Sequence, residues 1–366
     1  MLKIYFNKNL VDNYPHLPFL SPILWIFDNN WESPFWEDLI REWEKLWKKY
    51  LKFTTIEDCD YVVFPKNFAV DFMDELLREN KEAIKYWKKM IVFYRHDNEI
   101  SIDDPNIILF RTSVSKKASV NECCYPPIIE SIYSEKLSKI RNCKNSIWYT
   151  WYFEKPSFLL KILNFIRIHF SLDNFLYKVS VFLSFFIPDS VCAKFWINPV
   201  TKRDSFLYLM AQKWKWKQIR YSVIKDIQEL DYPFLFIRRE KMLDPLVKWN
   251  YREEYINNIY SCEFPLVVRW DWNYSYRLYE VMSAGKIPLF VDTWCKLPFE
   301  NEINYKSLFI RVPYYDVKNI WQYIKNYLAI NKDLKVVENK IKKCYEEYLR
   351  FPSWCTRIIN ILESQK

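Results

Sequence analysis

The residue types best suited to chemistry in this chain gather around the start of one predicted helix. Arg269 follows a short apolar run, and Asn273, Ser275 and Arg277 then lie where a helical pattern running to about Ala284 begins. Asn and Ser are favoured at the N-cap, and the N-terminus of a helix carries partial positive charge, so acidic neighbours are expected there. Two arginines at such a position instead indicate a bound anion, and a diphosphate is the usual one.

Glu280 lies three residues after Arg277 on the same predicted helix. At that spacing its carboxylate is able to pair with Arg277 or to accept hydrogen bonds from ribose hydroxyls. A surface helix with one ordinary i,i+3 ion pair accounts for the spacing equally well. Both interpretations therefore remain open from spacing alone.

The elements that position these residues form a strand–helix–strand unit. Apolar runs at 265–268 and 287–291 flank the helix and are typical of buried parallel strands. Gly285 follows the helix, where a residue that tolerates positive φ is favoured. The anion site is thus expected at the turn that leads from the first strand into the helix.

A longer series of positions matches a known family pattern. The matching positions are Arg269, the run Asn273–Tyr274–Ser275–Tyr276–Arg277–Leu278–Tyr279–Glu280, Gly285–Lys286–Ile287–Pro288, Leu297–Pro298–Phe299 and Ile303–Asn304–Tyr305, with Arg252, Tyr255 and Ser261 upstream. This order resembles the signature of the exostosin family, whose members include inverting glycosyltransferases that use nucleotide sugars. One departure is that Trp270 and Trp272 stand where the family has glycines.

The resemblance implies the fold class. It is α/β of the GT-B type, with two Rossmann-like domains that face an interdomain cleft and a C-terminal helix that crosses back. A length of 366 residues suits two domains, and the polar stretch at 135–145 suits a linker. We therefore expect an acceptor-binding domain at 1–142, a nucleotide-sugar-binding domain at 143–350 and the crossing helix at 351–366.

The resemblance also implies a donor site on the second domain, with the arginines on the diphosphate and Glu280 on the ribose. Arg238 and Arg239 end a predicted strand at 233–237, where GT-B enzymes commonly carry a basic residue near the diphosphate, although paired arginines are also ordinary surface charge. The expected donor-binding residues are Arg238, Arg239, Arg269, Asn273, Tyr274, Ser275, Tyr276, Arg277 and Glu280. Because this positive charge replaces a divalent metal, neither a metal nor another cofactor is expected.

A polar cluster follows the predicted strand at 90–94. His96, Asp97 and Glu99 lie at its carboxyl end, where open α/β sheets place ligands. Inverting transfer needs one general base to deprotonate the acceptor hydroxyl, and these three residues are the candidates. Taken singly, each is more often part of a solvated turn.

The net charge of +9 predicts attraction to acidic partners. Nucleotide sugars, acidic glycans, membrane surfaces and nucleic acids all qualify, but no nucleic-acid motif is present and no nucleic acid is expected. The implied acceptor is an oligosaccharide, a glycoprotein or a lipid-linked glycan. Amphipathic patterns at 158–196 favour packing on the core, with peripheral membrane contact as the alternative.

Cysteine and histidine usage bears on the compartment and on metals. Nine cysteines without repeated spacing favour free thiols in a reducing compartment. Residues 2–6 carry no signal or anchor pattern, so a cytoplasmic location is expected. His16, His96 and His169 are far apart and give no zinc spacing.

Two alternatives to a glycosyltransferase remain from the sequence. A catalytically inactive relative that binds glycans or scaffolds other enzymes is consistent with Trp270 and Trp272 in the loop. A basic nucleic-acid-binding protein is the weaker alternative, because only the net charge favours it.

Overall fold

The computed structural model describes most of the chain, in several separate ranges. These are residues 1–11, 41–66, 68, 72–94, 102, 104–112, 114, 121–129, 131–134, 137, 143–152, 220, 223–229, 234–239, 248–269 and 275–366. Within these ranges, no helix is both long enough and apolar enough to span a bilayer.

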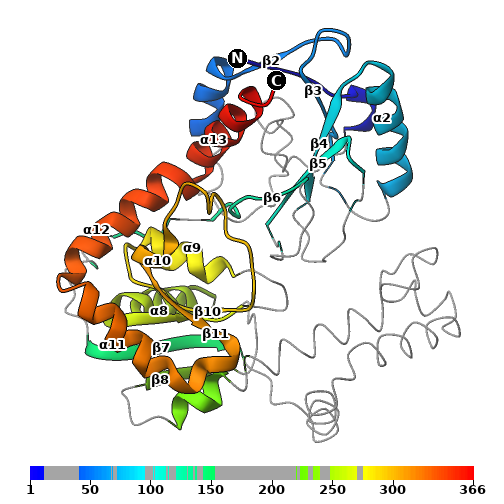
Figure 1. Cartoon of the computed structure of the whole chain (residues 1–366). Coiled ribbons are helices and arrows are strands. Elements are labelled where there is room, and N and C mark those ends of the chain that lie inside the picture. Colours follow the sequence, from blue (N-terminus) through cyan, green and yellow to red (C-terminus); the bar gives the residue numbers. More distant parts are fainter. Residues whose placement is uncertain are drawn as a thin grey trace, which may run out of the picture.

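The first six strands form one sheet in which every pairing is parallel, with the order β2-β1-β3-β4-β5-β6 (Figure 1). Its elements are β1 (Leu2–Tyr5), the 3₁₀ turns Lys8–Leu10 and Trp47–Lys49, β2 (Leu51–Phe53), β3 (Tyr61–Val63), α2 (Met73–Lys85), β4 (Lys89–Tyr94), β5 (Ile107–Arg111) and β6 (Glu122–Cys124).

Both faces of this sheet are buried. Along β4, Met90, Val92 and Tyr94 join the core under α2, whereas Ile91 and Phe93 join a second core on the opposite face. Alternate residues of a strand point to opposite faces, so the run of five buried residues in β4 requires cover on both sides, as strands of parallel sheets generally do.

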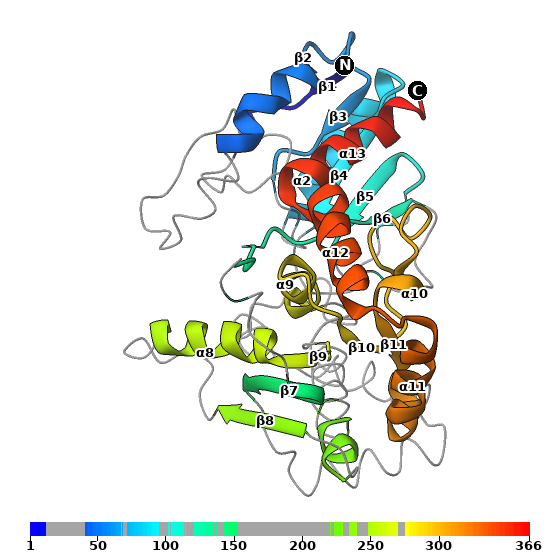
Figure 2. The same ribbon diagram turned by 90° about the vertical axis from the view of Figure 1, so that its left-hand side faces the viewer.

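Strands β7 to β11 form a second parallel sheet, with the order β11-β10-β9-β7-β8 (Figure 2). Its elements are β7 (Cys143–Tyr152), β8 (Phe234–Arg239), α8 (Lys248–Ser261), β9 (Cys262–Val267), α9 (Tyr276–Ser283), β10 (Leu289–Asp292), α10 (Tyr305–Leu308), β11 (Ile310–Pro313), a 3₁₀ segment (Tyr314–Asn319) and α11 (Ile320–Ile330).

Both sheets share one strand order, in which the chain starts one strand in from an edge, steps to that edge and then proceeds to the other edge. In such sheets the order reverses between two strands, here β1 and β3 in the first sheet and β7 and β9 in the second, and ligands bind at the carboxyl ends of the strands beside that point. The predicted fold class, α/β with two Rossmann-like domains of the GT-B type, is confirmed.

The end of the chain returns to the first sheet. Helix α12 (Leu334–Cys344) continues through one π-helical turn (Tyr345–Leu349) into α13 (Phe351–Glu363), which lies beside β1 and β3 (Figure 1). Trp354 of α13 is completely buried against the first sheet, and the Tyr61 hydroxyl donates to the Leu362 carbonyl at 3.1 Å. This helix therefore covers the face of the first sheet opposite α2.

The carboxyl ends of the two sheets meet. The loop after β10 brings Lys296 to the end of the first sheet, where its backbone N–H donates to the Val114 carbonyl at 2.8 Å. The Cys124 thiol at the end of β6 donates to the Lys296 carbonyl at 3.2 Å, and Phe299 packs on the cores of both domains. Each domain thus directs the ligand-binding edge of its sheet toward the other.

Candidate functional site

Helix α9 begins directly after the loop that follows β9. Residues 270–274, which include Asn273 and Tyr274 from the predicted donor set, lie outside the described ranges. Ser275 is the N-cap in an extended conformation, but its hydroxyl makes no capping hydrogen bond to the helix. The first-turn N–H groups of α9 are therefore not capped by this side chain and keep their capacity to bind an anion.

Arg277 points into the domain rather than toward solvent. Its side chain is 3% exposed, and its Nε donates to the Leu266 carbonyl of β9 at 2.8 Å, while Nη2 donates to Asn258 Oδ1 of α8 at 3.0 Å. The guanidinium also lies 5.4 Å from the ring centre of Tyr149 and 4.9 Å from that of Tyr255. Among the residues that the structure describes, Nη1 has no hydrogen-bond partner, so this nitrogen is a further donor of the buried cation.

Glu280 binds helix α8 instead of Arg277. One carboxylate oxygen lies 2.9 Å from Arg252 Nη1, and the other accepts a hydrogen bond from the Tyr255 hydroxyl. Burial, reinforced by the Glu280 charge, raises the pKa of Tyr255 well above its ordinary value, so the phenol stays protonated and remains a donor. The i,i+3 ion pair that the spacing allows between Arg277 and Glu280 is not formed.

Two more arginines lie at the same strand end. Arg269 directs Nη1 toward Thr293 Oγ1 at 3.3 Å, and Arg220 donates to the Arg269 carbonyl from Nη2 at 2.7 Å and from Nε at 3.2 Å. Both side chains are buried. Burial raises the pKa of Tyr149, and the positive charges of Arg220 and Arg277 oppose that shift, which places both cations near this phenol.

Sequence reasoning missed several members of this arrangement. Arg220, Asn258 and Thr293 were not predicted, and each reaches the site from a different part of the chain. Asn258 follows the matching positions Arg252 and Tyr255 on helix α8, at spacings that place all three near one helical face, so a periodicity argument had the means to find it. Nothing local distinguishes Arg220 from the other basic residues around it.

The remaining predicted residues are placed only in part. Arg238 and Arg239 are the last two residues of β8, in register with Trp151 and Tyr152 of β7. His96, Asp97 and Glu99 lie outside the described ranges, directly after the end of β4. Tyr276, the first residue of α9, is exposed.

A buried ion pair occupies the end of the first sheet, beside the strand that precedes those three residues. Arg111 Nη1 lies 2.8 Å from Glu122 Oε2, and its guanidinium stacks 5.4 Å from the ring centre of Tyr94, the last residue of β4. Both charged side chains are buried. The carboxyl ends of β4 and β5 are therefore held to the first residue of β6 by charge as well as by backbone pairing.

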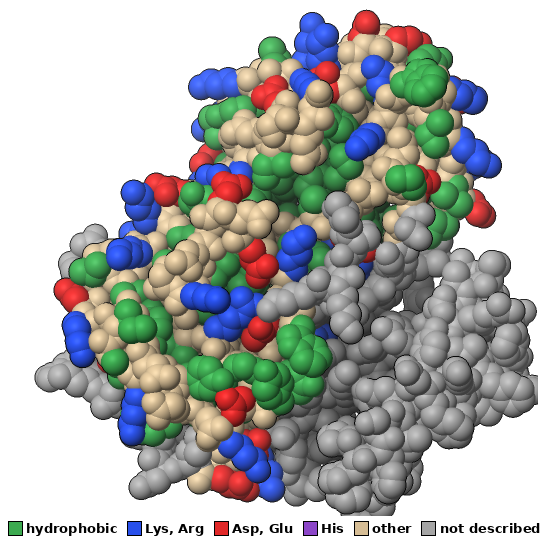
Figure 3. Space-filling model, in the orientation of Figure 1, with side chains coloured by type: hydrophobic (Ala, Val, Ile, Leu, Met, Phe, Trp, Pro, Cys, Tyr) green, Lys and Arg blue, Asp and Glu red, His purple; other side chains and the backbone are tan. Residues whose placement is uncertain are grey.

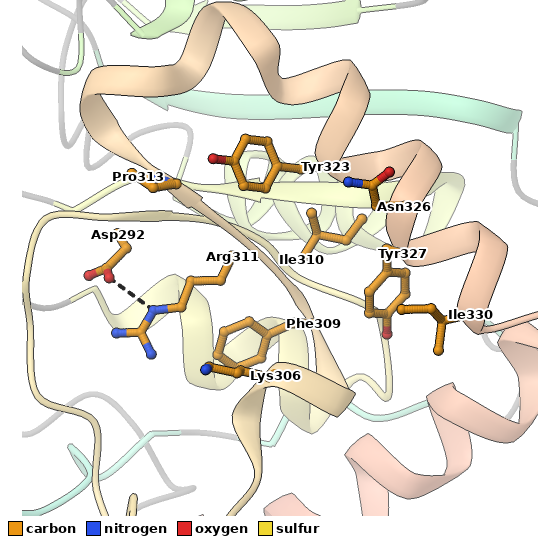
Figure 4. Close-up of a pocket in the computed structure, with 10 residues that line it drawn as sticks. All are labelled: Asp292, Lys306, Phe309, Ile310, Arg311, Pro313, Tyr323, Asn326, Tyr327 and Ile330. Atoms are coloured by element: carbon orange, nitrogen blue, oxygen red, sulfur yellow. Dashed lines mark hydrogen bonds and ion pairs between the residues drawn. The ribbon is translucent and has the colours of Figure 1, made fainter.

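A groove of about 450 Å³ runs along the edge strand β11 (Figure 4). At one end, Asp292 Oδ2 accepts from Arg311 Nε at 2.9 Å. The groove is lined by Asp292, Lys306, Phe309, Ile310, Arg311, Pro313, Tyr323, Asn326, Tyr327 and Ile330. Among the residues whose positions the structure gives, no group of three or more His, Cys, Asp and Glu side chains is arranged to hold a metal ion.

Comparisons with known proteins leave the family open. No protein-family model matches the chain, and neither does any curated protein. Two solved structures overlay on the full length of both chains at 8% identity: Anabaena Alr3699/HepE in complex with UDP-glucose, at a TM-score of 0.38, and the same protein in complex with UDP, at 0.39. Overlays this weak establish neither a shared family nor a shared ligand, so the resemblance to exostosins rests on the motif residues alone.

Proposed function

We propose that this protein is an inverting, metal-independent glycosyltransferase. It moves a sugar from a UDP- or GDP-linked donor to a hydroxyl of a glycan acceptor. The observation that carries the proposal is the convergence of Arg220, Arg269 and Arg277 at one end of the second sheet, beside the uncapped start of α9.

The charge argument starts from the cost of burying a cation. A buried guanidinium without a carboxylate partner is expensive, and within the described ranges Arg277 is held by a carbonyl, an amide oxygen and two ring faces but by no carboxylate. A bound diphosphate supplies the missing negative charge. The same positive charge stabilises the nucleotide diphosphate as it leaves, which is the task that a divalent metal performs elsewhere.

The roles of the donor residues follow from their positions. Arg269 follows β9 and Ser275 precedes α9, and the diphosphate binds between them, at the first-turn N–H groups of α9 and at Asn273 and Tyr274 of the intervening sequence. Arg277 acts from behind this loop through its charge. The remaining members of the donor site are Arg238 and Arg239 at the end of β8, Tyr276 at the helix start, and Glu280 toward the ribose.

The acceptor binds on the first domain. Asp97, Glu99 and His96 follow β4, whose carboxyl end is directed toward the second domain, and one of them serves as the general base. Basic side chains are distributed over the described face rather than gathered in one stripe (Figure 3), which favours a local anion site over a nucleic-acid track.

Nucleotide binding tests the proposal directly. We expect UDP or GDP to raise the melting temperature of the wild-type protein, and Arg269→Gln to weaken nucleotide affinity by about tenfold or more, since charge-assisted hydrogen bonds are lost. Arg78→Gln, an exposed arginine on α2, is the matched control and leaves the affinity unchanged. Failure of both nucleotides to stabilise the protein contradicts the proposal.

Turnover separates an enzyme from an inactive relative. Trp270 and Trp272 in the donor loop favour, as a second candidate, a protein that binds nucleotide and glycan without transfer. Hydrolysis or transfer of a nucleotide sugar in the presence of EDTA supports the enzyme. Nucleotide binding without either reaction supports the inactive relative, and strict dependence on added manganese contradicts the metal-independent mechanism.

A further inference from the structure

Three aromatic rings form a cluster where the second sheet ends. Trp294 follows β10, and Tyr314 and Tyr315 follow β11. The Trp294 ring lies 5.5 Å from that of Tyr314 and 6.4 Å from that of Tyr315, and the two tyrosine rings are 5.6 Å apart. Trp294 is 52% exposed and Tyr315 is 69% exposed. This set, Trp294, Tyr314 and Tyr315, is called the aromatic platform below.

The aromatic platform lies at the edge of the sheet where ligands bind. Asp292 of β10 pairs with Pro313 of β11, so the residues that follow each of them leave the sheet at the same level. They do so at the carboxyl ends of parallel strands, which is the end that carries binding sites in open α/β sheets.

The backbone at Trp294 is held in an unusual conformation. Its φ of 61° lies in the left-handed region, which a residue with a side chain adopts at a cost of roughly 1–2 kcal/mol. The Trp294 N–H donates to Asp292 Oδ1 at 2.8 Å, and Asp292 is itself fixed by Arg311. Such a conformation persists only where its surroundings enforce it, and these residues cluster at functional sites.

A second exposed tryptophan, Trp87, also has a left-handed backbone, but for a different reason. Trp87 has a similar φ of 58° and is 95% exposed, but it lies two residues after the end of α2, where left-handed backbone terminates a helix. Its N–H donates to the Ile84 carbonyl, as such an ending requires. The conformation of Trp87 is thus that of a helix ending, whereas the Trp294 N–H is bound by the Asp292 side chain, which Arg311 of the neighbouring strand holds in turn.

The size of the aromatic platform favours a small, flat partner. A protein partner needs about 800 Å² on each side, and three partly buried rings of roughly 150–250 Å² each fall short of that area. The face of an aromatic ring is electron-rich and attracts the C–H bonds of a pyranose, which are polarised by the neighbouring oxygens. Asp292 and Arg311 add polar groups at the adjoining end of the groove.

We propose that the aromatic platform binds a glycan through a pyranose ring stacked on Trp294, with the neighbouring sugar residues in the groove along β11. This inference rests on the proposed function: the reacting hydroxyl of the acceptor lies beside the general base on the first domain, and the aromatic platform on the second domain holds a more distant sugar residue of the same acceptor. The groove volume of about 450 Å³ falls within the range of small-ligand sites, about 300–1,000 Å³.

Fluorine NMR of the full chain labelled with 5-fluorotryptophan tests this assignment. The resonance that disappears in Trp294→Phe identifies Trp294. The probes are the pentasaccharides of cellulose, xylan, chitin, maltodextrin and polygalacturonate, added one at a time. We expect at least one of them to shift the Trp294 resonance saturably.

Three variants complete the test. Trp294→Ala and Tyr315→Ala are expected to weaken binding of that pentasaccharide by about tenfold, as loss of a stacked ring does. Trp87→Ala is the control and leaves the affinity for the pentasaccharide unchanged. Because Tyr315 is largely exposed, its truncation leaves the fold intact and keeps the test valid if Trp294→Ala is unstable.

The outcomes separate this inference from the proposed function. If no pentasaccharide shifts the Trp294 resonance while UDP or GDP still raises the melting temperature, glycan binding at the aromatic platform is refuted and the proposed donor site is supported. If a pentasaccharide binds at Trp294 but neither nucleotide binds, the aromatic platform stands and the transferase proposal fails. If Trp87→Ala and Trp294→Ala weaken pentasaccharide binding equally, glycan binding at the aromatic platform is also refuted.

Discussion

The Arg252 guanidinium lies 2.9 Å from the Glu280 carboxylate, which joins helix α8 to helix α9 behind the end of β9. The second oxygen of the same carboxylate accepts from the Tyr255 hydroxyl. A carboxylate offers about four acceptor positions, so these two bonds orient Glu280 and leave capacity for a ribose hydroxyl. The Arg252–Glu280 ion pair therefore connects the two helices and also holds the Glu280 carboxylate in an orientation suited to binding a ribose hydroxyl.

Glu280→Gln is expected to weaken UDP or GDP binding by about tenfold, because the amide retains an acceptor but loses the charge that Arg252 orients. Glu338→Gln is the matched control. Both glutamates are 14% exposed and each bridges to a basic side chain on another element, but Glu338 pairs with Lys286 and Lys335 away from the strand end. Calorimetric titration of each variant measures the difference, and equal losses in both variants contradict a specific role for Glu280.

Replacement of Arg277 is expected to damage the fold as well as the site. From the motif alone, Arg277→Ala is expected to impair transfer severely and to leave the fold intact, but the buried position changes this expectation. Truncation leaves the Leu266 carbonyl and the Asn258 amide without their donor and opens a cavity, at a cost of about 3 kcal/mol. Urea unfolding at pH 7 measures the loss, with exposed Arg78→Ala as the control.

Local signals predicted the strand–helix–strand unit of the second domain well. The apolar runs became β9 and β10, and the helical pattern between them became α9 with Ser275 as its N-cap. These elements depend on hydrophobic pattern and propensity over short stretches of chain. The predicted core strand at 90–94 is β4 for the same reason.

The direction of the site side chains was not predictable in the same way. Arg277 is enclosed by Tyr149, Asn258 and Leu266, which come from three different elements. Arg220 reaches the Arg269 carbonyl across 49 residues of chain. Whether an arginine at a helix start faces a ligand or the core depends on such long-range packing, which a motif does not encode.

Gly285, the single glycine of the chain, predicts a measurable stability effect. It ends α9 with φ of 71°, and a Cβ there meets its nearest neighbours, the Glu338 carbonyl and the Lys342 side chain, at an ordinary 3.5 Å. Gly285→Ala is therefore expected to cost about 1 kcal/mol from backbone strain alone. Gly285→Asn should cost less, because Asn tolerates this region best among residues with side chains. Thermal unfolding measures the stability of the two variants, and an equal loss of stability in both contradicts the strain argument.

The buried thiols predict a distinct pattern of chemical modification. Burial raises the pKa of Cys295 to about 12 and that of Cys59 to about 11, and it raises the pKa of Cys124 well above the ordinary value. Only the thiolate reacts with iodoacetamide. Among the seven cysteines whose side chains the structure describes, Cys123 is the one that is only partly buried.

We therefore expect iodoacetamide at pH 8 to modify Cys123 well before the other six, with mass spectrometry of peptides as the measurement. In urea all seven should react at similar rates.

The raised pKa of Cys295 also means that the folded state binds this proton more tightly than the unfolded state. Its contribution to stability is complete below about pH 8.5 and is lost as the pH rises toward about 12. The urea midpoint should fall between pH 8 and pH 10 by less in Cys295→Ala than in the wild type. An equal fall in both proteins would show that the thiol does not contribute to the alkaline loss.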